Sequence, residues 1–132
     1  MILTDINDSA GEKIASHNPS KMTYKSANVT SQSAWVDLSQ HIKSKHGKLD
    51  ILVNNAGTSY KNKPTLDVTE EEFDKVFTVN VKSIFWAIKE CIPIMERGAS
   101  VVNIASVSAT RPRGGLVWYA ASKGAVATVS TV

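Results

Sequence analysis

Between a predicted strand and a predicted helix the sequence runs Ser106-Val-Ser-Ala-Thr-Arg-Pro-Arg-Gly-Gly-Leu-Val-Trp-Tyr-Ala-Ala-Ser-Lys123. The apolar, β-branched run at residues 99–105 just before it is typical of a buried strand. Ser106 is therefore expected directly beyond the carboxyl end of that strand. One proline and two glycines within the stretch mark a loop, and the alanine-rich sequence from Trp118 onward favours a helix.

The chemistry of this stretch depends on two side chains four residues apart, Tyr119 and Lys123, which share one face of a helix. A free phenol is too weak an acid to exchange protons near neutral pH, but an ammonium group beside it stabilises the phenolate. The first helical turn, where Tyr119 is expected, also favours negative charge. Such a phenol could exchange a proton with a substrate oxygen held by the Ser106 hydroxyl. This spacing of Tyr and Lys also arises by chance, so other features of the chain are needed to support a catalytic pair.

Composition limits the possible functions. The net charge of +3 comes from scattered lysines without a basic run, so nucleic-acid binding is not supported. The single Cys91 excludes an internal disulfide and fits a reducing compartment. With no signal peptide or membrane-length apolar stretch in the sequence, we expect a cytoplasmic protein that does not bind a membrane. Surface positions, not a metal site, are expected for the three histidines, His17, His41 and His46.

Predicted strands and helices alternate along the chain, which is typical of a parallel sheet covered by helices. Strands are expected at residues 2–6, 22–27, 49–53 and 100–105. Helices are expected at residues 9–17 with Asp8 or Ser9 as the cap, at 31–45 with an apolar core stripe of Trp35, Leu38 and Ile42, and at 69–92 with a capping box of Thr69 and Glu72. The nearly apolar strand 49–53 is expected to be covered on both faces.

Unusual polar residues follow four of these strands: Asp5, Asn28, Asn54–Gly57 and Ser106. Loops are polar in any protein, but ligands of parallel α/β sheets bind beyond the carboxyl ends of the strands. Four consecutive strand ends of this kind favour a ligand site.

A further polar residue, Asn80, falls in the middle of the apolar face of helix 69–92, where an amide is costly unless it is hydrogen-bonded. It either satisfies backbone groups of a neighbouring element or performs a functional task, and the sequence leaves both open.

Together these motifs resemble the short-chain dehydrogenase/reductase family of the Tyr-x-x-x-Lys type. The resemblance rests on Asn54-Asn-Ala-Gly57 after a strand, Asn80 in the next helix, and Ser106 thirteen residues before Tyr119, and it covers essentially the whole chain. It implies an α/β fold with a Rossmann-like, doubly wound parallel sheet.

The resemblance also implies a catalytic quartet. Tyr119 would be the acid/base, Lys123 would tune it and hold the nicotinamide ribose, Ser106 would orient the substrate oxygen, and Asn80 would hold a water in a proton relay. The implied function is an NAD(P)-dependent oxidoreductase that interconverts a secondary alcohol and a ketone by hydride transfer. The alternative is a truncated, non-catalytic relative that acts at most as an interaction module.

The cofactor implied by the resemblance is NAD more than NADP. Asp5 would accept hydrogen bonds from the adenosine ribose hydroxyls and repel a 2′-phosphate. Asn28 and Val29 would flank the adenine, where the family more often has Asp-Val. The residues expected along the ribose are Asn55, Ala56 and Gly57, together with Tyr119 and Lys123.

Parts of the family pattern have no counterpart in the chain. Nothing before Asp5 matches the Gly-rich turn that holds the pyrophosphate, and the last residues fall within the helix that carries Tyr119. Residues 1–132 are therefore expected to be a single incomplete NAD(P)-binding domain, an internal fragment without its first and last two strands and inactive by itself. The family's strand order places the missing first strand between strands 2–6 and 49–53, so a structure should show either a gap or direct pairing there.

The expected partner is a small-molecule alcohol or ketone whose identity the sequence does not give. Arg111 and Arg113 could attract an acidic substrate, although arginines in a loop are more often simply solvated. Relatives commonly pair the helices equivalent to 69–92 and to the Tyr119 helix, so the whole protein is expected to be a homodimer or homotetramer.

Overall fold

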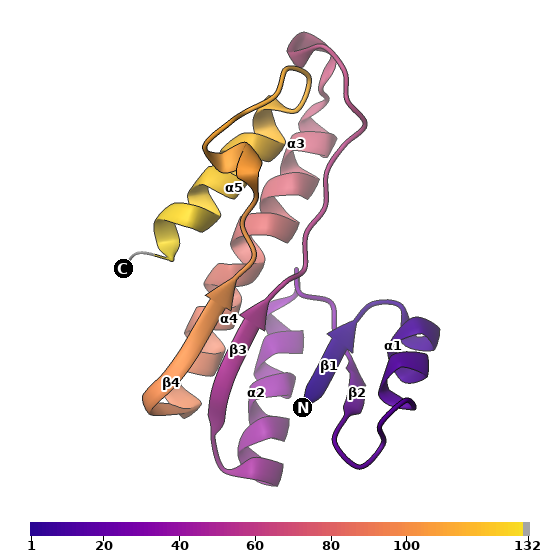
Figure 1. Ribbon diagram of the computed structural model, residues 1–132, viewed down its shortest axis with the longest axis vertical. Helices are drawn as coiled ribbons and strands as arrows, with labels where there is room; N and C mark the ends of the chain where they lie inside the picture. The colour runs from indigo at the N-terminus through magenta and orange to yellow at the C-terminus, as the bar shows by residue number, and fades with distance from the viewer. Residues whose placement is uncertain (131–132) are drawn as a thin grey trace.

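The strands of this chain form two separate two-stranded parallel sheets in the computed structural model, which describes residues 1–130 (Figure 1). Strand β1 (Ile2–Asp5) pairs with β2 (Thr23–Ser26), and β3 (Leu49–Asn54) pairs with β4 (Met95–Asn103). No ladder joins β1 to β3 within the described residues, so of the two predicted arrangements, a gap or direct pairing, the structure shows the gap.

Helix ends follow local capping chemistry. Helix α1 (Asp8–Ala15) is capped by Asn7, whose side chain accepts a hydrogen bond from the Ala10 backbone. The predicted cap at Asp8 or Ser9 is therefore wrong, because the Asn7 carbonyl already reaches the third helical N–H. Helix α2 (Gln32–His46) starts after the Ser31 cap and ends at Gly47, whose positive φ of 79° favours glycine.

The predicted helix 69–92 is continuous but irregular. Its capping box of Thr69 and Glu72 is confirmed at the start of α3 (Glu70–Phe77). A π-helical turn (Thr78–Lys82) then joins α3 to α4 (Ser83–Cys91), and a 3-10 turn at Ile92–Ile94 ends the segment. A π turn inserts one extra residue into the helical repeat, and a period of 3.6 residues cannot predict such an insertion. Asn80 lies at the centre of this turn.

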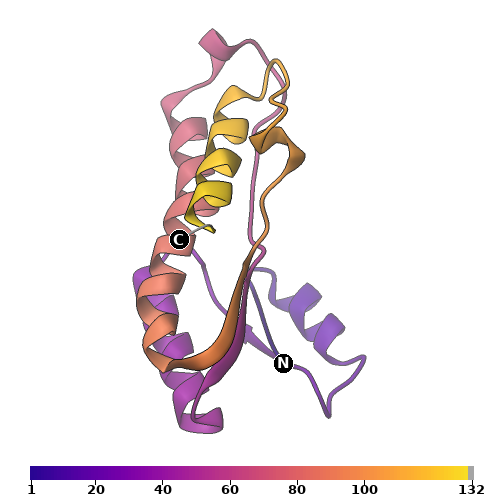
Figure 2. The ribbon, with the colours of Figure 1, turned by 60° about the vertical axis from the view of Figure 1, so that its left-hand side comes forward.

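Helices α2 and α4 cover one face of the β3–β4 sheet, whereas α1 packs against β1 and β2 on the other side of the molecule (Figure 2). The hydrophobic core confirms the predicted apolar stripe of α2. Its buried members are Trp35, Leu38, Ile42, Leu52, Ala87 and Cys91. Ile2 of β1 and Val29 after β2 also pack against this cluster. The two sheets are thus held together by side-chain packing in place of a shared ladder.

The opposite face of the β3–β4 sheet is exposed. Ile51 and Val53 are 63% and 55% exposed, whereas Leu52 between them is only 8% exposed. The prediction that this strand is covered on both faces is therefore wrong, because successive side chains of a strand point to opposite faces and helices cover only one. Val101 and Val102 of β4, expected to be buried, are also exposed.

Strand β4 begins at Met95, earlier than predicted, and it contains Gly98. The ladder skips between the pairs Leu49–Met95 and Ile51–Ser100. Gly98 has a φ of 95°, which lets the backbone bend at this irregularity without a Cβ clash.

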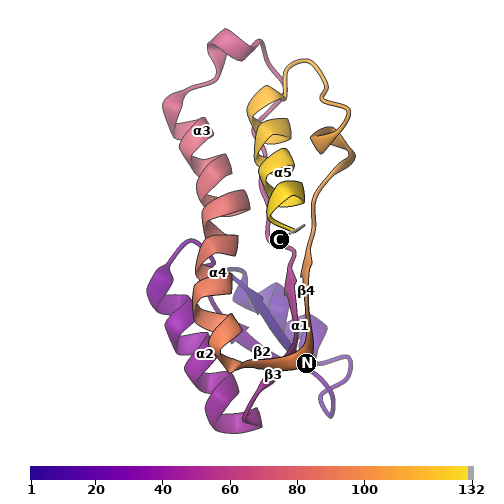
Figure 3. The ribbon, with the colours of Figure 1, turned by 90° about the vertical axis from the view of Figure 1, so that its left-hand side faces the viewer.

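Helix α5 (Val117–Val129) lies beside α3, beyond the carboxyl ends of β3 and β4 (Figures 1 and 3). Two short 3-10 turns, Thr65–Asp67 and Val107–Ala109, belong to the segments that lead to α3 and α5. No helix within residues 1–130 is long and apolar enough to cross a membrane.

Gly11 of α1 is a position where a side chain cannot be accommodated, because a Cβ there would overlap the Tyr24 ring. We expect Gly11→Ala to destabilise the whole protein by about 2 kcal/mol through overpacking, measured by chemical denaturation. The matched control is Gly124→Ala in α5, where a Cβ would meet no atom within 4 Å. That change should stabilise the helix by roughly 0.5 kcal/mol. Equal effects of the two changes would contradict the close packing of α1 on Tyr24.

Candidate functional site

The predicted catalytic residues lie at the carboxyl ends of β3 and β4 and on the adjoining helices. Ser106 lies shortly beyond β4, which ends at Asn103, and caps the 3-10 turn Val107–Ala109, where its Oγ accepts a hydrogen bond from Ser108 N at 3.1 Å. Tyr119 lies in the first turn of α5 and is partly exposed, one helical turn before the buried Lys123. Tyr119 and Lys123 lie on the helix as predicted, whereas Ser106 does not directly follow its strand, because β4 ends at Asn103 and not at the predicted residue 105.

Lys123 is a buried cation held by the strand ends. Its Nζ donates a hydrogen bond to the Ile104 carbonyl at 2.7 Å, which fixes α5 against the segment after β4. No carboxylate lies within ion-pair distance of it in residues 1–130. A Cβ built on Gly57 would lie 3.4 Å from this nitrogen and 3.5 Å from Asn80 Oδ1. The structure therefore brings Lys123 and Asn80 together around a glycine that leaves space between them.

Asn80 is fully buried and fully paired through its amino group. Its Oδ1 accepts from Thr58 N at 2.7 Å, and its Nδ2 donates to Thr58 O and to Ser122 Oγ, both at 2.9 Å. Of the two alternatives left open by the sequence, a structural and a functional Asn80, the structure shows the structural one, because the amide satisfies backbone groups of the loop after β3. The bonds leave one lone pair of Oδ1 for another donor, so the functional role stays a prediction.

Sequence reasoning missed Ser122, whose Oγ also donates to the Tyr119 carbonyl at 2.7 Å. A polar residue at the third position after Tyr119 in an apolar helix was the available signal. It also missed the amide chain in which Asn54 Nδ2 donates to Asn103 Oδ1 at 2.8 Å and Asn103 Nδ2 donates to Ser130 Oγ at 3.0 Å. Only the parallel register, which pairs Asn54 with Asn103, reveals this contact.

The start of α5 is fixed by the loop that follows Asn54–Gly57. Tyr60 Oη accepts from Trp118 N at 3.1 Å, which satisfies a helix-terminal N–H next to Tyr119. Asn62 Nδ2 donates to Gly114 O at 3.0 Å and Lys63 N to Gly115 O at 3.3 Å. The loop is in turn joined to α3, because Lys63 Nζ contacts both carboxylate oxygens of Glu72 at 2.6 and 2.8 Å.

The predicted cofactor residues follow β1, β2 and β3. Asp5 ends β1 with an exposed carboxylate, which accepts one hydrogen bond from Asn7 N at 2.9 Å. After β2, Asn28 Oδ1 accepts from the backbone and hydroxyl of Thr30, while Val29 O accepts from Trp35 Nε1. The three predicted residues beyond β3 are all exposed: Asn55, Ala56 and Gly57.

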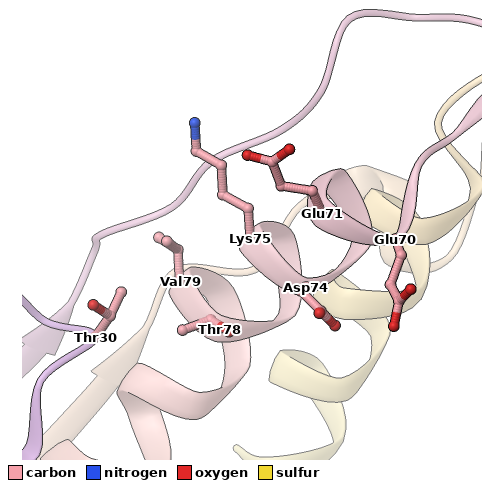
Figure 4. A pocket seen from close by; sticks show the side chains of 7 residues that line it. All are labelled: Thr30, Glu70, Glu71, Asp74, Lys75, Thr78 and Val79. Carbon is pink, nitrogen blue, oxygen red and sulfur yellow. The ribbon is translucent and has the colours of Figure 1, made fainter.

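Two other features lie apart from this site. Arg111 and Arg113 are exposed and make no ion pair with described residues. A pocket on α3, lined by Thr30, Glu70, Glu71, Asp74, Lys75, Thr78 and Val79, contains none of the predicted site residues (Figure 4). Its charged side chains are mostly acidic, and the carboxylates of Glu70 and Asp74 point away from the Lys75 amine (Figure 4).

Comparisons with known proteins identify the family of this chain. Residues 1–132 match the family described as short chain dehydrogenase. The 4-formylbenzenesulfonate dehydrogenase TsaC1/TsaC2 of Comamonas testosteroni is 50% identical over 82 residues, which are 61% of this chain and 32% of that protein. The cyclopentanol dehydrogenase of Comamonas sp. is 32% identical over 129 residues, which are 94% of this chain and 51% of that protein.

Solved structures show the same similarity. The 3-ketoacyl-(acyl-carrier-protein) reductase from Brucella melitensis, complexed with NADH, superposes with a TM-score of 0.92 at 31% identity, over 97% of this chain and 55% of that one. The matched parts of the chain thus cover from about a third to about half of the length of these relatives.

The contact between Lys63 and Glu72 predicts an acid dependence of stability. The Lys63 ammonium and the Thr69 N–H hold the pKa of the Glu72 carboxyl below its ordinary value of 4.5. A lowered folded-state pKa contributes stability that is present above the unfolded-state pKa and is lost as the pH falls through the folded-state pKa. We therefore expect Glu72→Gln to lower Tm at neutral pH and the difference from wild type to vanish in acid.

The measurement is Tm across an acid titration of the whole protein. The control is Glu71→Gln, one position earlier on α3 and without an ion pair in the described part of the chain. A Glu72→Gln difference that stays constant from neutral to strongly acidic pH would contradict the assignment.

Proposed function

Because this chain belongs to the short-chain dehydrogenase family, we propose that the whole protein is an oxidoreductase that interconverts a secondary alcohol and a ketone with a nicotinamide cofactor. The observation that carries the proposal is the cluster of Lys123, Asn80 and Gly57. Within it, Lys123 lies one helical turn after Tyr119 on α5. A buried ammonium without a carboxylate partner is costly, and the hydrogen bond to the Ile104 carbonyl uses only one of the three N–H donors of Lys123. No observation favours the non-catalytic alternative.

The residues present fit the ribose part of a nicotinamide cofactor. An ammonium has three N–H donors, and the Ile104 carbonyl accepts one from Lys123. The others are available for ribose hydroxyls, and the absent Cβ of Gly57 leaves room beside them. The Asp5 carboxylate, exposed at the end of β1, would take the adenosine ribose hydroxyls. When bound, the cofactor supplies the hydride acceptor for oxidation and the hydride donor for reduction.

The roles of the protein groups follow from their hydrogen bonds. The Ser106 oxygen is already an acceptor for Ser108 N, so its own proton is free to bind a substrate oxygen. The partly exposed Tyr119 phenol takes the alcohol proton during oxidation and returns it during reduction, while the Lys123 charge stabilises the phenolate. The remaining lone pair of Asn80 Oδ1 would hold the water of a proton relay.

The substrate is proposed only as a class. The relatives are named for a sulfonated benzaldehyde, for cyclopentanol and for a 3-ketoacyl thioester, which share a carbonyl or alcohol carbon and little else. A screen should therefore contain aldehydes as well as secondary alcohols and ketones. The exposed Arg111 and Arg113 make anionic members of each group useful additions to this screen.

The test of the function is cofactor-dependent turnover by the whole protein, followed by the absorbance of the reduced nicotinamide. In Tyr119→Phe we expect nearly all turnover to be lost while cofactor affinity stays close to wild type, because only the exchangeable proton is removed. Lys123→Ala should reduce both turnover and cofactor affinity, because the ammonium acts on the phenol and on the ribose. A Tyr119→Phe enzyme that keeps more than about a tenth of the wild-type kcat would exclude the assigned role.

Cofactor choice gives a separate prediction. The wild-type protein should prefer NAD over NADP by at least about tenfold in kcat/KM, because the Asp5 carboxylate would face the 2′-phosphate. Asp5→Ala should reduce that preference. The control is Glu12→Ala, which removes an exposed carboxylate from the neighbouring α1. Equal efficiency of the wild type with both cofactors would show the assignment of Asp5 to be wrong.

A further inference from the structure

Ser122 is a buried polar residue to which the proposed mechanism gives no role. It is 0% exposed, on a helix whose neighbouring positions are, apart from Tyr119 and Lys123, mostly alanine and valine. On the helix it shares a face with Tyr119, three residues earlier, and it directly precedes Lys123. Its position therefore connects it to both members of the predicted proton-transfer pair.

The hydrogen bonds of Ser122 have a defined direction. A hydroxyl has a single proton, and Ser122 donates it to the Tyr119 carbonyl at 2.7 Å. The oxygen is then an acceptor for Asn80 Nδ2 at 2.9 Å. The second N–H of that amide donates to Thr58 O, and its oxygen accepts from Thr58 N. Ser122 is thus the side chain through which α5 is bonded to Asn80 and, through Asn80, to the loop after β3.

We propose that Ser122 is a positioning residue, whose hydroxyl sets the place of the Tyr119–Lys123 pair relative to Asn80 and Gly57. The inference rests on the proposed function and adds a residue to it. Without the hydroxyl, Asn80 would keep its two bonds to Thr58 but lose its bond to α5. The helix could then shift relative to the Asn80 amide and the space beside Gly57, and a small displacement of reacting groups lowers the rate strongly.

A structural serine in the same region provides a matched control. Ser83 is 4% exposed, lies just after the π turn that contains Asn80, and donates to the Val79 carbonyl at 2.6 Å. Both serines are therefore buried and bonded to their own helix. Only Ser122 has a bond that crosses to another element, so the two alanine variants differ in that one respect.

The experiment compares wild type, Ser122→Ala, Ser83→Ala, Asn80→Ala and the double variant Ser122→Ala/Asn80→Ala in the whole protein. We expect Ser122→Ala to lower kcat about tenfold, with the KM for the cofactor changed less than about twofold. Ser83→Ala should lower Tm to a similar extent and leave kcat within about twofold of wild type. In the Asn80→Ala background, removal of the Ser122 hydroxyl should have no further effect on kcat, because the bond it makes is already lost.

Three outcomes would overturn the proposal: a wild-type kcat in Ser122→Ala, an equal loss in Ser83→Ala, or the same fold loss from Ser122→Ala in both backgrounds. A second measurement does not need turnover and so separates this inference from the proposed function. Hydrogen exchange of the Asn80 side-chain amide, assigned by its absence in Asn80→Ala, should become about tenfold faster in Ser122→Ala but not in Ser83→Ala. An unchanged exchange rate in Ser122→Ala would show that the hydroxyl does not hold the amide.

Discussion

The hydrogen bonds of one buried amide connect the parts of this structure that matter for its proposed chemistry. Asn80 lies in the π turn between α3 and α4, bonds to both backbone groups of Thr58, and bonds to Ser122 of α5. A buried amide is costly unless its donors and acceptors are satisfied. The loop after β3 and helix α5 can therefore occupy only the positions that satisfy it, and those positions bring Lys123 close to Gly57.

The two small sheets are held together by side-chain packing. Between β1 and β3 no backbone ladder is present within residues 1–130, and the connection is made by side chains around α2 such as Trp35 and Leu38. One face of β3 and β4 remains exposed and apolar, and open strand edges favour association with other chains. The half of the molecule with the predicted adenosine residues is thus held to the other half mainly through the α2 core.

Most of the elements and the location of the site could be predicted from local sequence. The capping box at Thr69, the apolar stripe of α2 and the position of Tyr119 on α5 agree with the structure because each depends on residues a few positions apart. The errors have a common origin. The exposed face of β3 and the early start of β4 depend on which elements are packed nearby, and the pattern within a strand does not contain that information.

The sequence by itself determined the α/β alternation, the family, and the identity of the residues expected to carry the chemistry, because spacing along one helix or past one strand end is a local property. Tertiary structure alone decided how those residues are held. The choice between a structural and a functional Asn80, the second bond of Ser122, and the Asn54–Asn103 amide pair all involve partners many residues apart. Such contacts form only in the folded chain, because only there are these residues brought together and only there does burial require each donor to be hydrogen-bonded.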